Sequence, residues 1–194
     1  MKSLRFLGNE ILLGTLIAVL SVFTAVASYQ GSIADSKQNE NEVKGMQSLN
    51  DGNAEYLSAN QFIVYDYNMY DGWYTADTAD KEEYYQTSYS PELQESIAAN
   101  ADDPFSEAYY DAMYASANDY WTESDAAFGA AGQWDNRGDG LQLVMLIMAL
   151  GLAFAAWASL LSSESNMRLF FSALAVIMLV FGLISYLGVP TITA

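Results

Sequence analysis

Apolar residues gather in three runs along the chain of 194 residues, and these runs predict membrane spans. They cover 11–29, 141–161 and 169–187, and none of them contains a charged residue. A helix rises about 1.5 Å per residue and the apolar core of a bilayer is about 30 Å thick, so each run can cross it. The segment 162–168 is short enough for only a tight turn, so the last two runs predict a transmembrane hairpin.

The polar segment 30–140 keeps a helical period between the first and second runs. Two series of residues recur every seven positions: Met46, Asn53, Asn60 and Tyr67, and beside them Leu49, Tyr56, Ile63 and Tyr70. This recurrence predicts a coiled-coil-like seam, in which one helix packs lengthwise on another. The chain is therefore expected to be an all-α membrane protein with three transmembrane helices. Its ectodomain is expected to be an elongated helical hairpin or three-helix bundle continuous with the spans.

A second helical stretch carries two adjacent apolar columns. They are Met113, Tyr120, Ala127 and Trp134, and Tyr114, Trp121 and Phe128. Two columns make a broad apolar face, which predicts contact with two neighbours or with a second subunit.

Turn and capping residues divide the polar segment. We expect a turn at Asp71-Gly72 or within 75–80, followed by a short helix around 81–88. Ser90-Pro91 and Asp103-Pro104 each place a capping side chain before a proline, so each predicts a helix start, the second one of a long helix. Glycine-containing sequences at 51–53 and 136–140 predict local loosening of the helices.

Charge is concentrated in the polar segment. Of the 24 acidic residues, 22 lie in 30–140 together with four basic ones, a formal charge of −18 there. Nucleic-acid binding depends on Lys and Arg, so this balance excludes it. A solvated acidic surface is the simplest interpretation, and weak binding of divalent cations is a further hypothesis. The many aromatic side chains of the segment are sufficient for it to fold.

Missing residue types narrow the chemistry. The chain has no cysteine and no histidine, which excludes thiolate and Ser-His nucleophiles and the usual zinc sites. A calcium-loop pattern beginning at Asp135 fails, because Leu146 stands where a bidentate Glu belongs. The sequence predicts no catalytic, cofactor-binding or metal-binding residues, and we expect a protein that is not an enzyme.

Basic residues near the spans predict the orientation. Lys2 and Arg5 precede the first run and Arg168 lies between the last two, and such residues favour the cytoplasmic side. Residues 1–10 and 162–168 are thus expected in the cytoplasm, and 30–140 and 188–194 outside the cell membrane; Arg137 argues the other way. A cleavable signal peptide ending at Ala25-Val26-Ala27 is the alternative, disfavoured by Glu10 beside the apolar run.

Two groups of residues are candidates for contact with other molecules. Small residues four apart allow helices to approach closely: Gly14 and Ala18, Ser21 and Ala25, Ala149 and Ala153, Gly151 and Ala155. The candidate interaction surface of the ectodomain is aromatic: Tyr67, Tyr70, Trp73, Tyr114, Trp121 and Phe128. A pocket for a sugar or a cationic ligand is the alternative interpretation of the dense aromatic stretch at 65–74.

The order of the parts carries a resemblance. One span followed by Ala27-Ser28-Tyr29-Gln30, then a helical ectodomain and a C-terminal span hairpin, resembles a family of bacterial membrane proteins of unknown function. The resemblance implies an envelope protein and assigns no functional residue. We expect a non-catalytic structural or accessory subunit that self-associates, or joins a larger complex, through its spans and its aromatic face. An extracytoplasmic ligand-binding sensor and an oligomeric pore remain alternatives.

Overall fold

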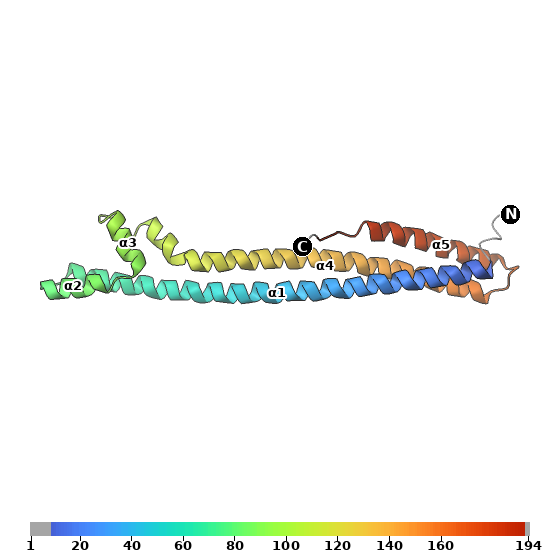
Figure 1. Ribbon diagram of the computed structural model, residues 1–194, viewed down its shortest axis with the longest axis horizontal. Coiled ribbons are helices and arrows are strands. Elements are labelled where there is room, and N and C mark those ends of the chain that lie inside the picture. The colour runs from blue at the N-terminus through green and yellow to red at the C-terminus, as the bar shows by residue number, and fades with distance from the viewer. Residues whose placement is uncertain (1–8, 193–194) are drawn as a thin grey trace. The chain divides into compact units, whose positions relative to one another are not determined.

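The computed structural model describes residues 9–192, which form five α-helices and no strand (Figure 1). The helices are α1 (Glu10–Tyr74), α2 (Ala79–Thr87), α3 (Pro91–Ala99), α4 (Glu107–Leu160) and α5 (Asn166–Leu187). The all-α prediction is confirmed.

Three of these helices, α1, α4 and α5, are long and apolar enough to cross a membrane. They contain the three apolar runs of the sequence, except for Leu161, which follows α4. The turn between α4 and α5 is closed by Arg168, which is 4% exposed and donates a hydrogen bond to the Leu161 carbonyl oxygen at 2.9 Å. This places a cation at the negative end of α4, an arrangement that favours the charge. Lys2 and Arg5 lie outside the described residues.

The helices form two compact units. The span unit comprises 1–41 and 129–194, of which 9–41 and 129–192 are described, and the acidic unit comprises 42–128. Helices α1 and α4 contribute residues to both units. The acidic unit has 18 acidic and two basic residues, a formal charge of −16.

Small side chains allow the helices of the span unit to pack closely. A Cβ atom added at Gly151 of α4 would lie 2.9 Å from Met178 and 3.0 Å from Leu20. One added at Gly182 of α5 would lie 2.6 Å from Met148. Lipid chains are as apolar as the side chains they replace, so association of spans depends on such close contact. The buried core of this unit is Leu16, Leu20, Ala27, Val144, Met148, Ala155 and Ala175.

Hydrogen bonds join α5 and the segment after it to α1 and α4. The Arg137 guanidinium donates to the carbonyl oxygen of Pro190 at 2.5 Å, and the side chains of Gln30 and Tyr186 are hydrogen-bonded at 2.9 Å. Val189 packs against Gly140, where an added Cβ would lie 3.4 Å from its side chain. Arg137, which disagreed with the orientation rule, thus binds a backbone oxygen of its own chain.

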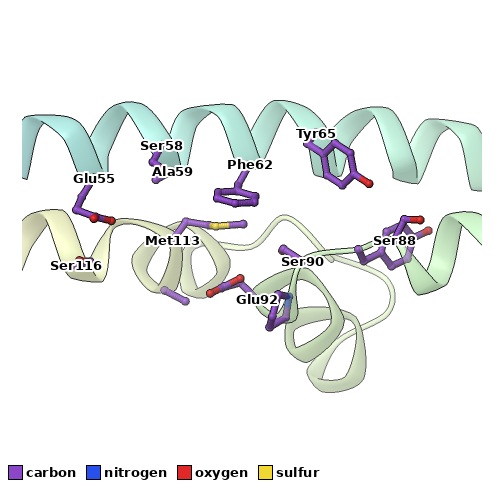
Figure 2. Close-up of a pocket in the computed structure, with 13 residues that line it drawn as sticks. Glu55, Ser58, Ala59, Phe62, Tyr65, Ser88, Ser90, Glu92, Met113 and Ser116 are labelled. Atoms are coloured by element: carbon purple, nitrogen blue, oxygen red, sulfur yellow. The ribbon is translucent and has the colours of Figure 1, made fainter.

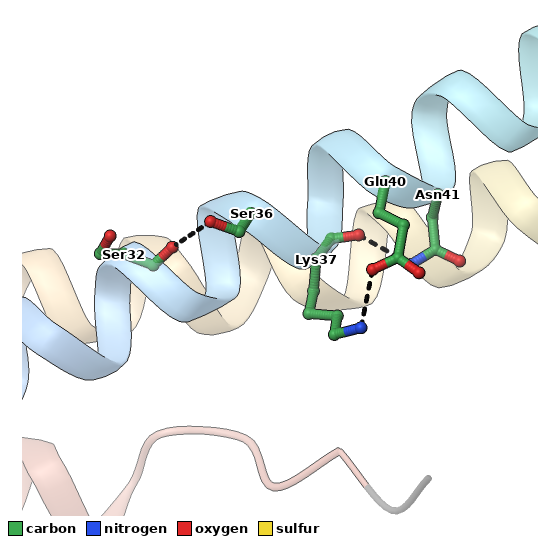
Figure 3. A network of polar contacts seen from close by, with 5 residues as sticks. All are labelled: Ser32, Ser36, Lys37, Glu40 and Asn41. Carbon is green, nitrogen blue, oxygen red and sulfur yellow. Dashed lines mark hydrogen bonds and ion pairs between the residues drawn. The ribbon is translucent and has the colours of Figure 1, made fainter.

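Several polar side chains of α1 in the span unit find partners within the helix (Figure 3). The Ser36 hydroxyl donates to the Ser32 carbonyl oxygen, and the Asn41 amide to that of Lys37. Lys37 pairs with Glu40 at 2.7 Å, and this hydrogen bond and the lysine charge lower the pKa of Glu40. These side chains thus find partners three or four residues away on their own helix.

Buried positions on α1 of the acidic unit also carry small residues. They are Gly45, Ser48, Gly52, Ala59, Ile63 and Asp66, at steps of three, four or seven. A Cβ added at Gly52 would lie 2.7 Å from the Trp121 ring and 3.2 Å from the Ala117 carbonyl oxygen of α4. The Ser124 hydroxyl donates to the Gly45 carbonyl oxygen at 2.9 Å. The two helices therefore approach almost to backbone contact, and they are antiparallel.

The predicted seam was wrong by about one residue. Met46 is 60% exposed, and Asn53, Tyr67, Leu49 and Tyr56 are exposed as well. Of the eight predicted seam residues only Ile63 is buried, with Asn60 and Tyr70 half-buried. Glycine, alanine and serine one position earlier occupy the seam because they allow the closer approach. The larger residues border it.

Several boundaries need correction. The turn follows Tyr74, and Ser90 caps α3 as predicted, with Pro91 at its first position. The start at Asp103-Pro104 was wrong: α4 begins at Glu107, after Ser106, whose carbonyl oxygen accepts bonds from the next turn. The loosening expected at 51–53 and 136–140 was also wrong. The helices continue through both sequences, and their glycines leave space for neighbouring side chains: Trp121 at Gly52 and Asp35 at Gly138.

The close approach at Gly52 predicts opposite effects of one substitution at two glycines. Alanine in place of helical glycine gains about 1 kcal/mol in helix propensity. At Gly52 the contact with the Ala117 carbonyl should outweigh that gain, since overpacking costs about 1–3 kcal/mol. We expect Gly52→Ala to lower the thermal unfolding midpoint, measured by circular dichroism in mild detergent.

Gly129→Ala is the matched control. A Cβ there would meet no described atom within 4 Å, so the midpoint should rise. A rise for both variants would contradict the close approach.

Candidate functional site

A buried carboxylate joins three parts of the acidic unit. Asp66 of α1 is fully buried and accepts bonds from the Ser90 backbone nitrogen at 2.8 Å and the Ser90 hydroxyl at 2.5 Å. The Tyr109 hydroxyl of α4 donates to it at 2.8 Å. A buried charge is costly unless it is hydrogen-bonded, and three donors meet this requirement. Asp66 therefore fastens the start of α3 between α1 and α4.

Ser90 links the Asp66 carboxylate to the first turn of α3. Its hydroxyl oxygen, which donates to Asp66, also accepts a bond from the Leu93 backbone nitrogen at 3.1 Å and so caps the helix. Leu93 is fully buried in the core of the unit. The direction of α3, and with it the place of Glu92 in its first turn, is fixed by the Asp66–Ser90 pair.

Five of the six predicted aromatic residues fall into two clusters. In the first, Tyr70 lies 5.3 Å from Trp73, and Phe105 lies 4.3 Å from Tyr67 and 5.4 Å from Tyr70, between ring centroids. The Tyr67 hydroxyl is also hydrogen-bonded to that of Tyr110. The first cluster therefore joins α1 to the start of α4.

In the second cluster, Tyr56 lies 5.2 Å from Tyr114 and 5.7 Å from Trp121. The Tyr114 hydroxyl donates to Asn60 at 3.0 Å. Phe128 lies apart, half-exposed, with its ring against Gly45. A role of these six residues in binding a partner stays a prediction.

Hydroxyls in this region hold their protons. Burial raises the pKa of Tyr89 to about 12, with the charges of Tyr70 and Asp66 adding to the effect. The hydrogen bond with Tyr67, followed by burial, raises the pKa of Tyr110 to about 12. Burial and the bond to Asp66 also raise the pKa of Tyr109. At neutral pH these groups are hydrogen-bonding hydroxyls.

A cleft of about 500 Å³ opens where α1, the start of α3 and α4 meet, and we call it the three-helix cleft (Figure 2). Its lining from α1 is Glu55, Ser58, Ala59, Phe62 and Tyr65; from the α2–α3 junction and α3, Ser88, Tyr89, Ser90, Pro91 and Glu92; and from α4, Ala112, Met113 and Ser116. Two carboxylates and several hydroxyls thus surround an apolar floor. No basic residue lines the cleft.

A second cavity, of about 390 Å³, is lined by Tyr70, Trp73, Tyr89, Ile97 and the amides of Gln86 and Gln94, among others. Tyr89 lines both cavities, and it is 7% exposed. Its hydroxyl is buried and has no hydrogen-bond partner among the described residues.

Asp66, Glu55 and Glu92 were not among the site residues predicted from the sequence. Asp66 lies seven positions after Ala59 and 14 after Gly52 in the buried column, which is the signal that could have marked it. Glu55 carries no such signal. Within residues 9–192 no group of three or more acidic side chains is arranged to hold a metal ion. Weak binding of divalent cations stays a prediction.

The small residues of the spans differ in their surroundings. Gly151 and Ala155 are buried within the span unit. Gly14, Ala18, Ala149 and Ala153 are exposed, and a Cβ added at Gly14 would meet no described atom within 4 Å.

The exposed small residues of α1 extend further than the pair Gly14 and Ala18. Ser21 and Ala25 are exposed too: Ser21 follows Ala18 by three positions, and Ala25 follows Ser21 by four. We call Gly14, Ala18, Ser21 and Ala25 the outward stripe of α1.

Comparisons with known proteins identify no relative. No family model matches the chain, and no curated protein and no solved structure matches it either.

The two buried tyrosine hydroxyls predict opposite responses to the same substitution. Tyr109→Phe removes a donor to Asp66 and should lower the free energy of unfolding by about 1.5–3 kcal/mol, the usual value for a bond to a charged group. Tyr89→Phe removes a buried hydroxyl without a partner, and should raise the free energy by about 1 kcal/mol. Denaturant unfolding followed by tyrosine and tryptophan fluorescence would measure both. Equal losses would contradict the assignment of partners.

Proposed function

We propose that this protein is a non-catalytic structural or accessory membrane subunit that self-associates through its spans. The observation that carries the proposal is the outward stripe of α1, which residues 9–192 leave uncovered. Gly151 and Ala155, in contrast, are buried by contacts within the chain. Small residues allow a second helix to approach closely, and this contact drives association where lipid removes the hydrophobic effect.

The spacing of the stripe supports a helix partner rather than a point contact. Its four residues follow steps of four, three and four, the period of helices packed lengthwise. Larger exposed residues, Ile11, Val22 and Val26, border it. The exposed Ala149 and Ala153 of α4 offer a second surface of the same kind.

Charge directs the association to the spans. The acidic unit carries a formal charge of −16, so two copies repel each other there within a screening length of roughly 10 Å at 0.1 M salt. The spans contain no charge to oppose contact.

We also propose an orientation in the cell membrane. The turn 162–168 and residues 1–10 would face the cytoplasm, and the acidic unit would lie outside. The bases at 2, 5 and 168 support this orientation. Arg137 is the one base that argues against this orientation. Its hydrogen bond to the Pro190 carbonyl oxygen supports the orientation, because it gives Arg137 a structural role within the chain.

Self-association is tested by enlarging the stripe. We expect the double variant Gly14→Leu, Ala18→Leu to weaken dimerisation at least about tenfold, a loss of about 1.4 kcal/mol. The measurement is native mass spectrometry of nanodisc-embedded protein, with energy transfer between labelled copies to obtain the affinity.

Ile177→Phe, Ile184→Phe is the matched control, since both residues are exposed on α5, a helix that carries no part of the stripe, and their enlargement should leave the dimer unchanged. A wild-type protein that is monomeric under all conditions would refute the proposal.

The orientation is tested with single cysteines, since the natural chain has none. In intact cells a membrane-impermeant maleimide should label Ala115→Cys, an exposed position of the acidic unit. It should label Ser163→Cys, in the turn before α5, only after permeabilisation. The reverse pattern would overturn the orientation.

A further inference from the structure

We propose that the span unit binds a zwitterionic phospholipid, with the phosphodiester of the lipid held by Arg137 and its ammonium group beside neighbouring aspartates. The site is a cavity of about 290 Å³ that we call the interfacial cavity. It is lined by Gln30, Ile33, Trp134, Arg137, Thr191 and Ile192. The inference rests on the proposed crossing of the membrane by the spans, but not on their self-association.

The interfacial cavity lies at the depth of the lipid headgroups. Gln30 borders the end of the first apolar run, and Arg137 precedes Leu141, the start of the second run, by four residues. Four helical residues span about 6 Å. The headgroup region covers about 5–7 Å on each side of the hydrocarbon core. With the spans in a bilayer, Arg137 is therefore at the level of the lipid phosphates.

Arg137 keeps donors for a phosphate group. Its guanidinium has five N–H donors. Its hydrogen bonds go to neutral oxygens, the Pro190 carbonyl at 2.5 Å and the Gln30 side chain at 3.4 Å. Within residues 9–192 it forms no ion pair, and its side chain is half-buried. A partly desolvated guanidinium without a counter-charge favours a planar or tetrahedral oxyanion that can accept two bonds at once, as a phosphodiester does.

The other walls of the interfacial cavity favour a lipid over a free anion. Among residues 9–192 no carboxylate lines it. Trp134 is half-buried, and tryptophan rings are enriched at headgroup level in membrane proteins. Ile33 and Ile192 add apolar surface, which the glycerol and first methylenes of a lipid would cover. A free phosphate ion would leave that surface exposed to water.

Nearby aspartates favour a headgroup that carries its own cation. Asp135 and Asp139 lie two positions before and after Arg137 on α4. A Cβ added at Gly138 would lie 2.9 Å from a carboxylate oxygen of Asp35 on α1. All three aspartates are exposed, and none forms an ion pair within residues 9–192. These carboxylates repel an anionic headgroup and attract the ammonium group of phosphatidylethanolamine.

The lipid selectivity of the wild-type protein tests the proposal without any substitution. Delipidated full-length protein in mild detergent is titrated with dioleoylphosphatidylethanolamine, with dioleoylphosphatidylglycerol and with dioleoylglycerol, which has the same chains but no phosphate. Native mass spectrometry gives the affinity for each lipid. We expect phosphatidylethanolamine to bind at least about tenfold more tightly than dioleoylglycerol and at least about threefold more tightly than phosphatidylglycerol.

Two wild-type results would overturn the site. Tighter binding of phosphatidylglycerol, or of dioleoylglycerol, would contradict the headgroup class. Displacement of the bound lipid by excess inorganic phosphate would identify a site for the free ion instead.

Substitution of Arg137 tests its role. Arg137→Gln should weaken binding of phosphatidylethanolamine at least about tenfold and leave binding of dioleoylglycerol unchanged. The matched control is Lys37→Gln, which removes the same charge from an exposed side chain of the span unit that does not line the cavity. It should change the affinity less than about twofold.

An equal loss in the two variants would show only a general effect of positive charge and overturn the site. Equal weakening of both lipids by Arg137→Gln would also overturn it, since Arg137 would then act only by holding the segment after α5. Dimer masses in the same spectra report self-association separately, so the failure of one proposal is distinguished from the failure of the other.

Discussion

The close approach of α1 to α4 is the constraint on which the rest of the acidic unit depends. Gly52 lies against the Ala117 backbone, and the Ser124 hydroxyl reaches the Gly45 carbonyl oxygen. Large residues of α1 do not occupy the seam, because its glycines leave their space to the Trp121 and Phe128 rings of α4. Tyr56 of α1 lies beside the seam, where it contacts the rings of Tyr114 and Trp121. The placement of the aromatic residues therefore follows from the glycines of α1.

Hydrogen bonds to Asp66 hold α3 against the pair of α1 and α4. The seam alone would hold α1 and α4, but α3 has only nine residues and needs an anchor. Asp66 supplies it by accepting bonds from Ser90, the residue that caps α3, and from Tyr109. Asp66 does not itself line the three-helix cleft, but it fixes the start of α3, whose residues Ser90, Pro91 and Glu92 form part of the cleft wall.

The sequence was sufficient for the helices but not for their contacts. Apolar runs predicted three spans because length and hydrophobicity act locally, and Ser90-Pro91 predicted the start of α3 for the same reason. The seam was misplaced because large residues carry the stronger pattern, whereas Gly45 and Gly52 contribute by having no side chain. Asp103-Pro104 failed as a helix start although its local signal equals that of Ser90-Pro91. Glu55 and Glu92 come together only through the fold, and no local pattern marks such a pair.

The hydrogen bond between Gln30 and Tyr186 joins residues 156 positions apart, near opposite ends of the chain. In a protein made and inserted from its N-terminus, such a contact is among the last to form. α1 is therefore complete before α5, which supplies its partner in this bond, has been synthesised. Until α5 is in place Gln30 lacks the Tyr186 hydroxyl, so the span unit reaches its final hydrogen bonding only when its last helix is added.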